Sequence, residues 1–465
     1  MNRKSIRILL AIIMVIIIQV TTITGVTALA SKGDFTIQNG VLKAYTGKGG
    51  NVVIPDGVIE IDDEVFRDCT TITSITIPDS VVTIGDRAFQ NCSGIKEITI
   101  PKGVRNYGYS VFSYCTGLVT AIFEDGLEII GPTMFLGCTN LKTVYISETI
   151  KSIYTCSFSG CEKLQGFIVD PESRYFEEVD GVLYWRNLAA IYKYPQGKKQ
   201  TTFNVPEGVE RIINQAFSDC VNLTKIKLPE SLIEIDALAF TGCKNLDEII
   251  LPQNLQTIDV WAFNECINIK SVYIPASVYD IHGGAFSACS SLESYYLDNA
   301  NTTYTSIDGV LFTKDKSVLI SYPGGRNGDY EIRTGTTEIG EFAFYNCEYL
   351  TSITIPDTVS AINEYAFSEC NNLININIPD SITYIGEYAF SNAPLTGISD
   401  NSVSVLKRLY KGNDDRWYEN IMYSKKILES NNNITGQWLN PGNYVGIDYG
   451  GTNISRISKD IEMLS

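Results

Sequence analysis

The sequence contains few of the side chains on which catalytic centres and metal sites depend. Histidine occurs once, at His282, and the chain has no C-x-x-C pair of the kind that binds zinc. No serine or cysteine arrangement typical of nucleophilic catalysis accompanies His282, so we interpret it as a surface histidine. These shortages predict a protein without metal, cofactor or catalytic residues, and therefore one that is not an enzyme.

Long apolar runs are equally scarce, and the only one lies at the start of the chain. Three basic residues within the first seven precede eleven uninterrupted apolar residues, Ile8–Ile18. Ala28-Leu29-Ala30 then provides a small-residue cleavage site before Ser31. An uncleaved membrane anchor is the alternative, but the apolar run is shorter than the ~20 residues that a span needs. We predict a signal peptide over residues 1–30 and no stable membrane span after its removal.

Basic residues are outnumbered by acidic ones. The net charge is −17, and it becomes −20 without the three basic residues of the signal peptide. Such a surface repels nucleic acid and anionic lipid, so neither is an expected partner. The acidic residues are spread over many loops, which favours a solvated surface over a single charged site.

What the sequence has in abundance is a repeat. A phenylalanine recurs every 23 residues, in three runs that together make twelve copies of one unit. The recurring residues are Phe66, Phe89, Phe112, Phe135 and Phe158, then Phe217, Phe240, Phe263 and Phe286, then Phe344, Phe367 and Phe390. A fixed period of this size indicates a solenoid of stacked repeats.

Each position of the unit has a physical role. Ile95–Ile100 is apolar at its first, fourth and sixth places, which predicts a short strand with one buried face. Pro101 ends the strand because proline cannot donate to a sheet ladder. Val81 and Ile84 form a second short apolar pair, and a tight turn leads to Phe89. Stacking buries all these side chains in one continuous core, which no single copy could do.

The unit resembles the BspA-like class of leucine-rich repeat. The residues that carry the resemblance are I-P-D-S-V, I-G, A-F, N-C and I-x-x-I-x-I, as they stand in residues 77–100. The resemblance covers residues 51–395. It implies an α/β to mainly β fold: a right-handed solenoid of short parallel strands, short helical turns and inserted β-hairpins. It also implies a secreted or cell-surface, adhesin-like protein that binds extracellular protein or glycan.

The repeat divides the chain that follows the predicted signal peptide into three regions. Residues 31–54 predict an N-terminal cap hairpin, residues 55–395 the solenoid, and residues 396–465 a C-terminal tail or cap. Two inserts, near residues 170–204 and 298–332, interrupt the solenoid and share an Asp-Gly-Val-Leu start. We interpret each insert as a degenerate repeat plus a projecting hairpin. It could reset the curvature or flank a binding face, and the sequence does not separate these roles.

Cysteine is frequent, and twelve cysteines in an exported chain could indicate disulfides. Eleven of them, however, occupy one repeat position, which predicts a ladder of buried, reduced thiols. The ladder residues are Cys69, Cys92, Cys115, Cys138, Cys161, Cys220, Cys243, Cys266, Cys289, Cys347 and Cys370. Cys156 lies outside the ladder and is expected to be more exposed.

Three further motifs have weaker signals. The carboxylates between Asp170 and Asp180 could form a calcium loop, but they lack the spacing of known loops. Residues 445–453 resemble the first phosphate-binding segment of sugar kinases, but too little chain follows, and we interpret them as a hairpin turn. Asn301-Thr-Thr303 and Asn433-Ile-Thr435 match the N-glycosylation acceptor.

The binding site is predicted from the strand positions that face solvent. The third and fifth residues of each strand should point away from the core. The fifth positions are polar at both ends of the solenoid and, apart from Lys227, apolar or aromatic in the centre. The central residues are Ile122, Tyr145, Ile168, Ile250, Tyr273 and Tyr296. We predict that they form a stripe on the concave strand face that binds ligand. The alternative is that an insert hairpin or the tail covers the stripe.

Two other functions stay open at this point. The protein could be a structural spacer in a larger surface assembly, which polar strand faces would favour. It could also be a glycan-active enzyme, which would need a projecting carboxylate pair. The carboxylates at outward strand positions, Glu97 and Glu248, are far apart in the stack. The sequence predicts neither the ligand nor the oligomeric state.

Overall fold

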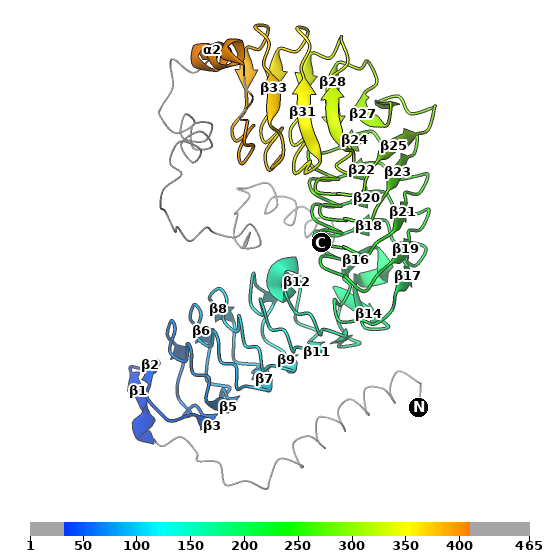
Figure 1. Cartoon of the computed structure of the whole chain (residues 1–465). Helices are drawn as coiled ribbons and strands as arrows, with labels where there is room; N and C mark the ends of the chain where they lie inside the picture. The colour runs from blue at the N-terminus through cyan, green and yellow to red at the C-terminus, as the bar shows by residue number, and fades with distance from the viewer. Residues whose placement is uncertain (1–31, 396, 398, 410–465) are drawn as a thin grey trace.

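The computed structural model describes residues 32–395, 397 and 399–409. These residues form a curved solenoid, and successive repeats stack along the curve (Figure 1). The predicted signal peptide and residues 410–465 of the predicted tail lie outside the described residues. The predicted fold class is confirmed, because the chain is a stack of short parallel strands with a step of 23 residues.

One side of every repeat carries a longer strand. These strands pair in parallel with a register of one repeat, as Thr99 does with Ile122. Along each strand, buried apolar residues that point into the core alternate with residues that point outward, as predicted. The long strands are β3 (Gly50–Val53), β5 (Ile72–Thr76), β7 (Glu97–Ile100), β9 (Thr120–Phe123), β11 (Thr143–Ile146), β13 (Gly166–Val169), β17 (Thr202–Asn204), β19 (Lys225–Lys227), β21 (Glu248–Ile250), β23 (Ser271–Ile274), β25 (Ser294–Leu297), β29 (Gly328–Glu331), β31 (Leu350–Thr354) and β33 (Asn375–Asn377).

A second side carries strands of two residues each, whose isoleucine or equivalent residue is buried in most copies. They also pair in parallel from repeat to repeat. The short strands are β4 (Glu60–Ile61), β6 (Thr83–Ile84), β8 (Asn106–Tyr107), β10 (Ile129–Ile130), β12 (Ser152–Ile153), β18 (Arg211–Ile212), β20 (Glu234–Ile235), β22 (Thr257–Ile258), β24 (Asp280–Ile281), β30 (Glu338–Ile339), β32 (Ala361–Ile362) and β34 (Tyr384–Ile385).

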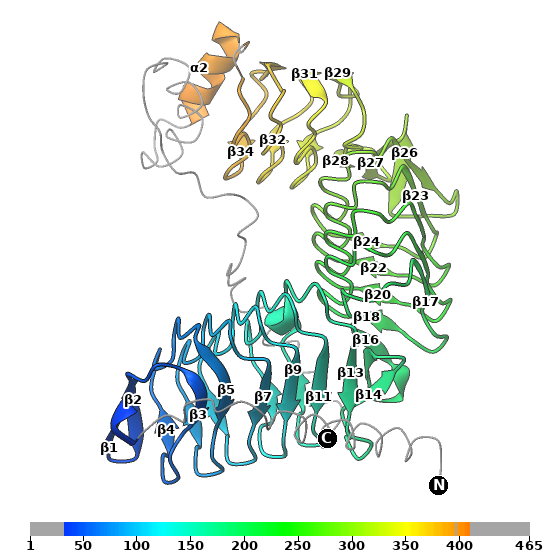
Figure 2. The ribbon, with the colours of Figure 1, turned by 60° about the horizontal axis from the view of Figure 1, so that its bottom comes forward.

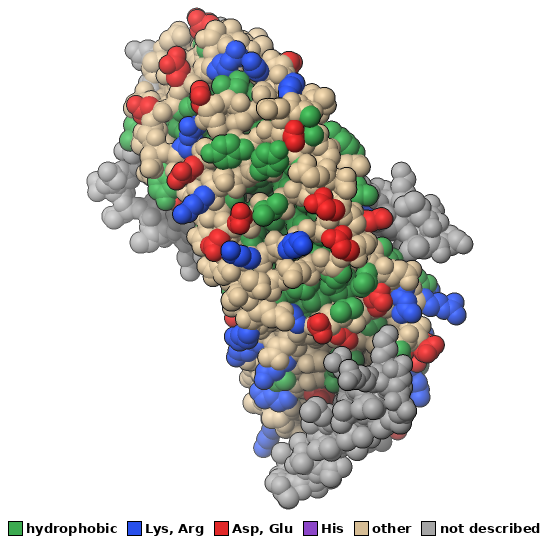
Figure 3. Space-filling model, turned by 90° about the vertical axis from the view of Figure 1, so that its right-hand side faces the viewer, with side chains coloured by type: hydrophobic (Ala, Val, Ile, Leu, Met, Phe, Trp, Pro, Cys, Tyr) green, Lys and Arg blue, Asp and Glu red, His purple; other side chains and the backbone are tan. Residues whose placement is uncertain are grey.

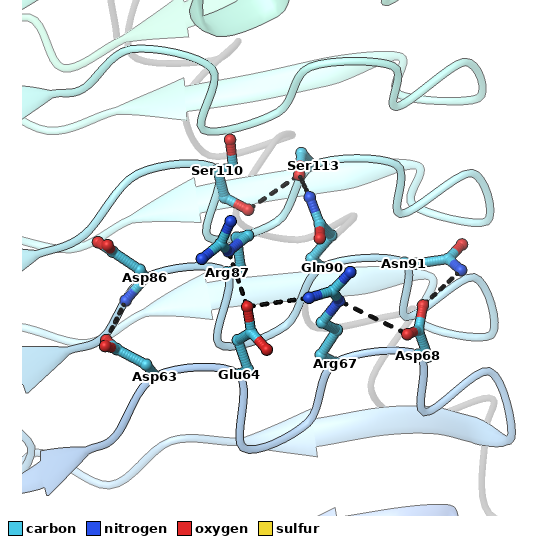
Figure 4. Close-up of polar contacts among 10 residues, drawn as sticks. All are labelled: Asp63, Glu64, Arg67, Asp68, Asp86, Arg87, Gln90, Asn91, Ser110 and Ser113. Atoms are coloured by element: carbon cyan, nitrogen blue, oxygen red, sulfur yellow. Dashed lines mark hydrogen bonds and ion pairs between the residues drawn. The ribbon is translucent and has the colours of Figure 1, made fainter.

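The third side of each repeat consists mostly of non-helical turns. The resemblance had implied short helical turns at this position. In the second repeat, Arg87 and Asn91 have positive φ values of 52° and 60°, which interrupt any helix. The turns form a ladder of their own, since the Phe66 amide donates to the Ala88 carbonyl at 2.8 Å. Polar side chains connect neighbouring turns, and Glu64 accepts from both Arg67 and Arg87 at 2.9 Å (Figure 4). The repeat turn Thr155–Phe158 (η2) is a 3₁₀ helix.

The phenylalanine rings stack through the core. In the second run, neighbouring rings lie 4.9–5.1 Å apart and within 10° of parallel. Each run begins on a tyrosine ring instead: Tyr45 on Phe66, Tyr194 on Phe217 and Tyr322 on Phe344. The core accordingly forms three hydrophobic clusters. We divide the chain at the inserts into the first block (residues 35–169), the second block (176–297) and the third block (304–409), and the first two clusters each extend into the hairpin of the next block.

Each block begins with a hairpin. Asn39-Gly40, Asp180-Gly181 and Asp308-Gly309 all have positive φ at both residues, which is the geometry of a type I′ turn. The cap strands β1 (Phe35–Gln38) and β2 (Val41–Tyr45) pair antiparallel. The inserts have three strands each: β14 (Phe176–Val179), β15 (Val182–Trp185) and β16 (Ala190–Lys193), then β26 (Tyr304–Ile307), β27 (Val310–Thr313) and β28 (Val318–Ser321).

The insert hairpins do not project from the solenoid, in contrast to the expectation from sequence. β16 and β28 pair in parallel with β18 and β30, so the hairpins extend the sheets of short strands. Their apolar residues complete the core, and Val182, Leu183, Val310 and Leu311 are fully buried. The long-strand sheets, by contrast, stop at each insert.

The C-terminal end of the third block is covered by a helix. Helix α2 (Asp400–Leu409) places the buried side chains of Val405 and Leu406 on the last repeat. The Ser402 hydroxyl accepts a hydrogen bond of 2.7 Å from the Ile378 amide. The helix therefore shields apolar residues that would otherwise face solvent at the end of the stack.

The curve of the solenoid places the long strands on its outer side. In Figure 1, β17 to β25 lie outside β16 to β24, and Figure 2 shows the same relation in the third block. The prediction that the strand face is concave is therefore wrong. Curvature is the sum of small rotations between repeats and of the offsets at the inserts, and no single sequence position specifies its direction.

Candidate ligand-binding face

The predicted stripe residues lie side by side within two separate sheets. In the first block, Tyr145 on β11 is in register with Ile122 on β9 and Ile168 on β13. In the second block, Tyr273 on β23 is in register with Ile250 on β21 and Tyr296 on β25. The sheet break between β13 and β17 separates the two groups. The sequence therefore predicted the neighbours within each group, whereas the structure divides the stripe in two.

The two groups differ in exposure. Ile250, Tyr273 and Tyr296 have 67%, 44% and 58% of their surface exposed, and we call them the outer patch. The three residues of the first block are only partly exposed. Figure 3 shows hydrophobic side chains gathered along the middle of this outer face, with charged side chains around them. The outer patch is thus the part of the stripe most available to a partner.

Parallel pairing holds the outer patch on a rigid base. The residues between its members, Ile249, Val272 and Tyr295, point inward and are almost fully buried. The Tyr273 hydroxyl donates to an Asp298 carboxylate oxygen at 3.1 Å. Local desolvation and this hydrogen bond raise the pKa of Tyr273. Tyr296 has no hydrogen-bond partner among the described residues, so its hydroxyl is available to a ligand.

The first-block group has a more enclosed environment. Partial burial raises the pKa of Tyr145, and the nearby Glu97 carboxylate adds to the shift. Burial also raises the pKa of Glu97 itself. Because burial removes surface that a partner could contact, this group offers less binding area than the outer patch.

A shallow depression adjoins the outer patch and was not predicted from sequence. It has a volume of about 260 Å³ and lies on β17, β19 and β21. Its lining residues are Thr202, Phe203, Asn204, Lys225, Ile226, Lys227, Glu248 and Ile250. The alternating K-I-K pattern of residues 225–227 already places two lysines on the outward side of one strand, and this signal could have revealed the basic border of the depression.

The weaker candidate sites in the sequence are occupied by local contacts. His282 lies between two carboxylates, with Nδ1 3.2 Å from Asp259 and Nε2 3.1 Å from Asp280. Asp170 accepts from the Glu172 amide at 2.9 Å, which is a local turn contact. Among the described residues, no group of three potential ligands has the arrangement of a metal site.

The glycosylation motif at Asn301 is structural. Its side chain is 1% exposed and donates to the Pro275 and Val278 carbonyls at 2.9 Å. Its oxygen accepts from the Thr303 and Tyr304 amides at 3.0 and 2.8 Å. The folded protein therefore has no accessible acceptor there. The second motif, at Asn433, and residues 445–453 lie outside the described residues.

The cysteines form the ladder expected from their spacing. None of the twelve is in a disulfide, and ten of the eleven ladder cysteines are buried. Within the runs the thiols donate to the phenylalanine carbonyl of the preceding repeat, as Cys115 does to Phe89 at 3.1 Å. Burial raises the pKa of Cys115 to about 12. Cys69 and Cys156 are only partly buried.

The repeat sequence, the parallel ladders and the aromatic core together indicate one type of repeat. The profile of the BspA-type leucine-rich repeat region matches residues 36–165, 192–318 and 329–409 in six copies. The chain belongs to the BspA-type leucine-rich repeat family. The gap between the first two matched stretches contains the hairpin of β14 and β15, whereas the hairpin of β26 and β27 lies within the second matched stretch.

Solved structures with this architecture include bacterial relatives. The pneumococcal vaccine antigen PcpA is 22% identical with a TM-score of 0.52, over 72% of this chain and 79% of that protein. A leucine-rich repeat protein from Eubacterium ventriosum is 22% identical with a TM-score of 0.50, over 76% and 88%. Identity at this level demonstrates a shared fold. A search of curated proteins finds no match.

The BspA-type fold agrees with the composition. Leucine-rich repeat solenoids are generally non-enzymatic and commonly bind proteins through their repeat surfaces. Within residues 32–409, omitting 396 and 398, no helix is long and apolar enough to cross a membrane. The outer patch is therefore the leading candidate for a functional surface.

Proposed function

We propose that this protein is an extracellular, adhesin-like binding protein that recognises a protein ligand through the outer patch. The observation that carries the proposal is the exposure of Ile250, Tyr273 and Tyr296 in direct register on three adjacent strands. Tyrosine combines a large rigid contact area with a hydrogen-bonding tip, and it is enriched among the residues that dominate protein interfaces. A glycan is the alternative ligand class.

The extracellular location is supported by the sequence and by the relatives. The basic start, the apolar run and the small-residue cleavage site of residues 1–30 have the features of a signal peptide. PcpA, which shares the fold, is a vaccine antigen. The protein is accordingly secreted or retained at the cell surface.

The other two functions have less support. A glycan hydrolase would need two carboxylates within about 10 Å of each other across a substrate. Glu97 on β7 and Glu248 on β21 belong to different sheets. A structural spacer would have no reason to expose an isoleucine and two tyrosines in one row.

The proposal is tested by a binding screen followed by one variant. The purified protein is screened against extracellular-matrix proteins and a glycan array. For a ligand that binds, the triple variant Ile250→Ser, Tyr273→Ser, Tyr296→Ser should weaken the affinity at least 100-fold, because three central contacts of ~1 kcal/mol or more are lost. Circular dichroism verifies that the variant is folded.

A matched control separates the site from general loss of apolar surface. Tyr279, Tyr349 and Ile374 are 55%, 44% and 44% exposed but do not belong to the outer patch. Their triple serine variant should bind the ligand like the unmodified protein. Equal affinities of the outer-patch variant and the unmodified protein would place the binding site elsewhere. A screen without any ligand would favour the spacer.

A further inference from the structure

The outer patch is bordered by charged side chains that have no partner within the molecule. Lys225, Asp247, Lys270 and Glu293 are all exposed, and none forms an ion pair or side-chain hydrogen bond among the described residues. Lys227 and Glu248 share this property. These six side chains belong to the four consecutive repeats that contain β19, β21, β23 and β25.

Some charges elsewhere on the solenoid pair with a neighbouring repeat. Lys102 pairs with Asp79 of the preceding repeat at 2.9 Å, and Lys151 pairs with Glu128 at 2.7 Å. Stacking therefore brings opposite charges of neighbouring repeats into contact where the positions allow it. Around the outer patch Lys225 is in register with Glu248, yet the two side chains form no ion pair. These charges remain available to groups outside the molecule.

The signs of these charges change from repeat to repeat in an ordered way. The β19 repeat carries Lys225 and Lys227, and the β21 repeat carries Asp247 and Glu248. The β23 repeat carries Lys270, and the β25 repeat carries Glu293. The sequence of signs along the sheet is thus plus, minus, plus, minus. Reversing this order exchanges plus for minus at every strand.

A two-fold axis performs this reversal. Consider a two-fold axis that lies in the interface, runs parallel to the strands and passes between β21 and β23. This axis places β19 opposite β25 of a second copy, and β21 opposite β23 of that copy. Lys225 then faces Glu293, and Asp247 faces Lys270, twice each in the dimer. An axis perpendicular to the strands would place each strand against itself and oppose like charges. The charge pattern therefore selects one of the two symmetric arrangements.

From this arrangement, we propose that the outer patch binds the outer patch of a second copy of this chain. The inference rests on the proposed function, because it names a partner for the same surface. The apolar row is compatible with the same axis: Ile250 of one copy covers Tyr273 of the other, and Tyr296 covers the aliphatic part of Lys227. Buried apolar contacts in the centre and ion pairs at the rim are the usual anatomy of a protein interface.

The shape of the solenoid permits this contact. The sheet lies on the outer side of the curve, so two copies can approach face to face without their ends colliding (Figures 1 and 3). Four strands at ~4.8 Å spacing and six residues at ~3.3 Å each cover roughly 400 Å² per copy. This area is about half that of a standard interface, as in weak and transient complexes, so we expect a weak dimer.

A charge exchange between two variants tests the proposal. Sedimentation equilibrium of the purified protein, without other ligands, should show a monomer–dimer equilibrium that weakens at high salt. Lys225→Glu and Glu293→Lys should each weaken dimerisation at least 10-fold, because each opposes like charges twice. An equimolar mixture of the two variants should form a heterodimer with affinity close to that of the unmodified protein, since both contacts are again complementary.

A second exchange and one control make the result specific. Asp247→Lys and Lys270→Asp should behave in the same way, separately and mixed. Lys244→Glu, which alters a lysine paired with Glu265 at 3.3 Å, should leave dimerisation unchanged. A monomer at all concentrations up to 500 µM, or variants that weaken dimerisation without rescue in the mixture, would overturn the proposal. Neither outcome affects the binding screen, which tests the proposed function with other molecules.

Discussion

Replacing Asn301 should destabilise the protein more than any exposed substitution in the same loop. Its side chain makes four hydrogen bonds, to the Pro275 and Val278 carbonyls and from the Thr303 and Tyr304 amides. Asn301→Ala removes all four in a site that is 1% exposed. A lost hydrogen bond to a buried group costs about 1 kcal/mol, and more where the group stays unpaired, so we expect a loss of about 3–5 kcal/mol.

The measurement is urea unfolding followed by circular dichroism. Asn299 in the same loop is exposed and makes no side-chain hydrogen bond in the described structure, so Asn299→Ala should change the free energy of unfolding by less than about 0.5 kcal/mol. Asn301→Asp keeps the acceptor but removes both donors and faces two carbonyls with a negative charge. It should therefore be at least as destabilising as alanine. A loss below 1 kcal/mol for Asn301→Ala would refute this account of the loop.

Two further predictions concern buried polar and thiol groups. Lys193 is 1% exposed, contacts the Gln215 carbonyl and Ser218 hydroxyl, and has its pKa lowered by burial. Because the unfolded chain then binds more protons, stability should rise with pH between this lowered pKa and about 10.5. Lys193→Met should raise the free energy of unfolding at pH 7 and abolish the rise of stability with pH, as measured by urea titrations at several pH values. An unchanged pH dependence in this variant would contradict a lowered pKa of Lys193. Thiol titration of the native protein should label Cys69 and Cys156 first and the buried ladder cysteines only after denaturation; rapid labelling of most ladder cysteines would contradict their burial.

The repeat itself could be predicted from the sequence because each of its positions has a simple physical role. Phe89 and Cys92 recur at a fixed step, so they must stack on their equivalents in any solenoid of this period. The same periodicity placed Tyr273 beside Ile250 and Tyr296, and the register confirms this. Local pattern and parallel pairing were sufficient for these neighbours.

The direction of the curve could not be predicted. It depends on rotations of a few degrees per repeat and on the offsets introduced by the inserts. For this reason the outer patch lies outside the curve and not in a concavity. The inserts also cause the break between β13 and β17. The first insert adds its strands to the short-strand side only, and the long-strand sheet is therefore interrupted between Ile168 and Ile250.

The inserts themselves could be predicted only in part. The Asp180-Gly181 and Asp308-Gly309 turns were visible as hairpin signals, but their position over the core was not. Val182 on β15 and Val310 on β27 are buried because the neighbouring strands β16 and β28 pair with β18 and β30 of the following repeat. The role of Asn301 was hidden for the same reason, because two of its partners belong to the preceding repeat.

The most direct test of the central claim is hydroxyl-radical footprinting of the complex with the protein ligand that the binding screen returns. The claim is that the outer patch forms the contact surface. Oxidation of Tyr273 and Tyr296 should fall at least 5-fold on binding, whereas oxidation of Tyr279, which is 55% exposed on the short-strand side, should stay unchanged. Protection of Tyr279 with full oxidation of Tyr273 and Tyr296 would contradict the claim and place the ligand on the inner side of the curve.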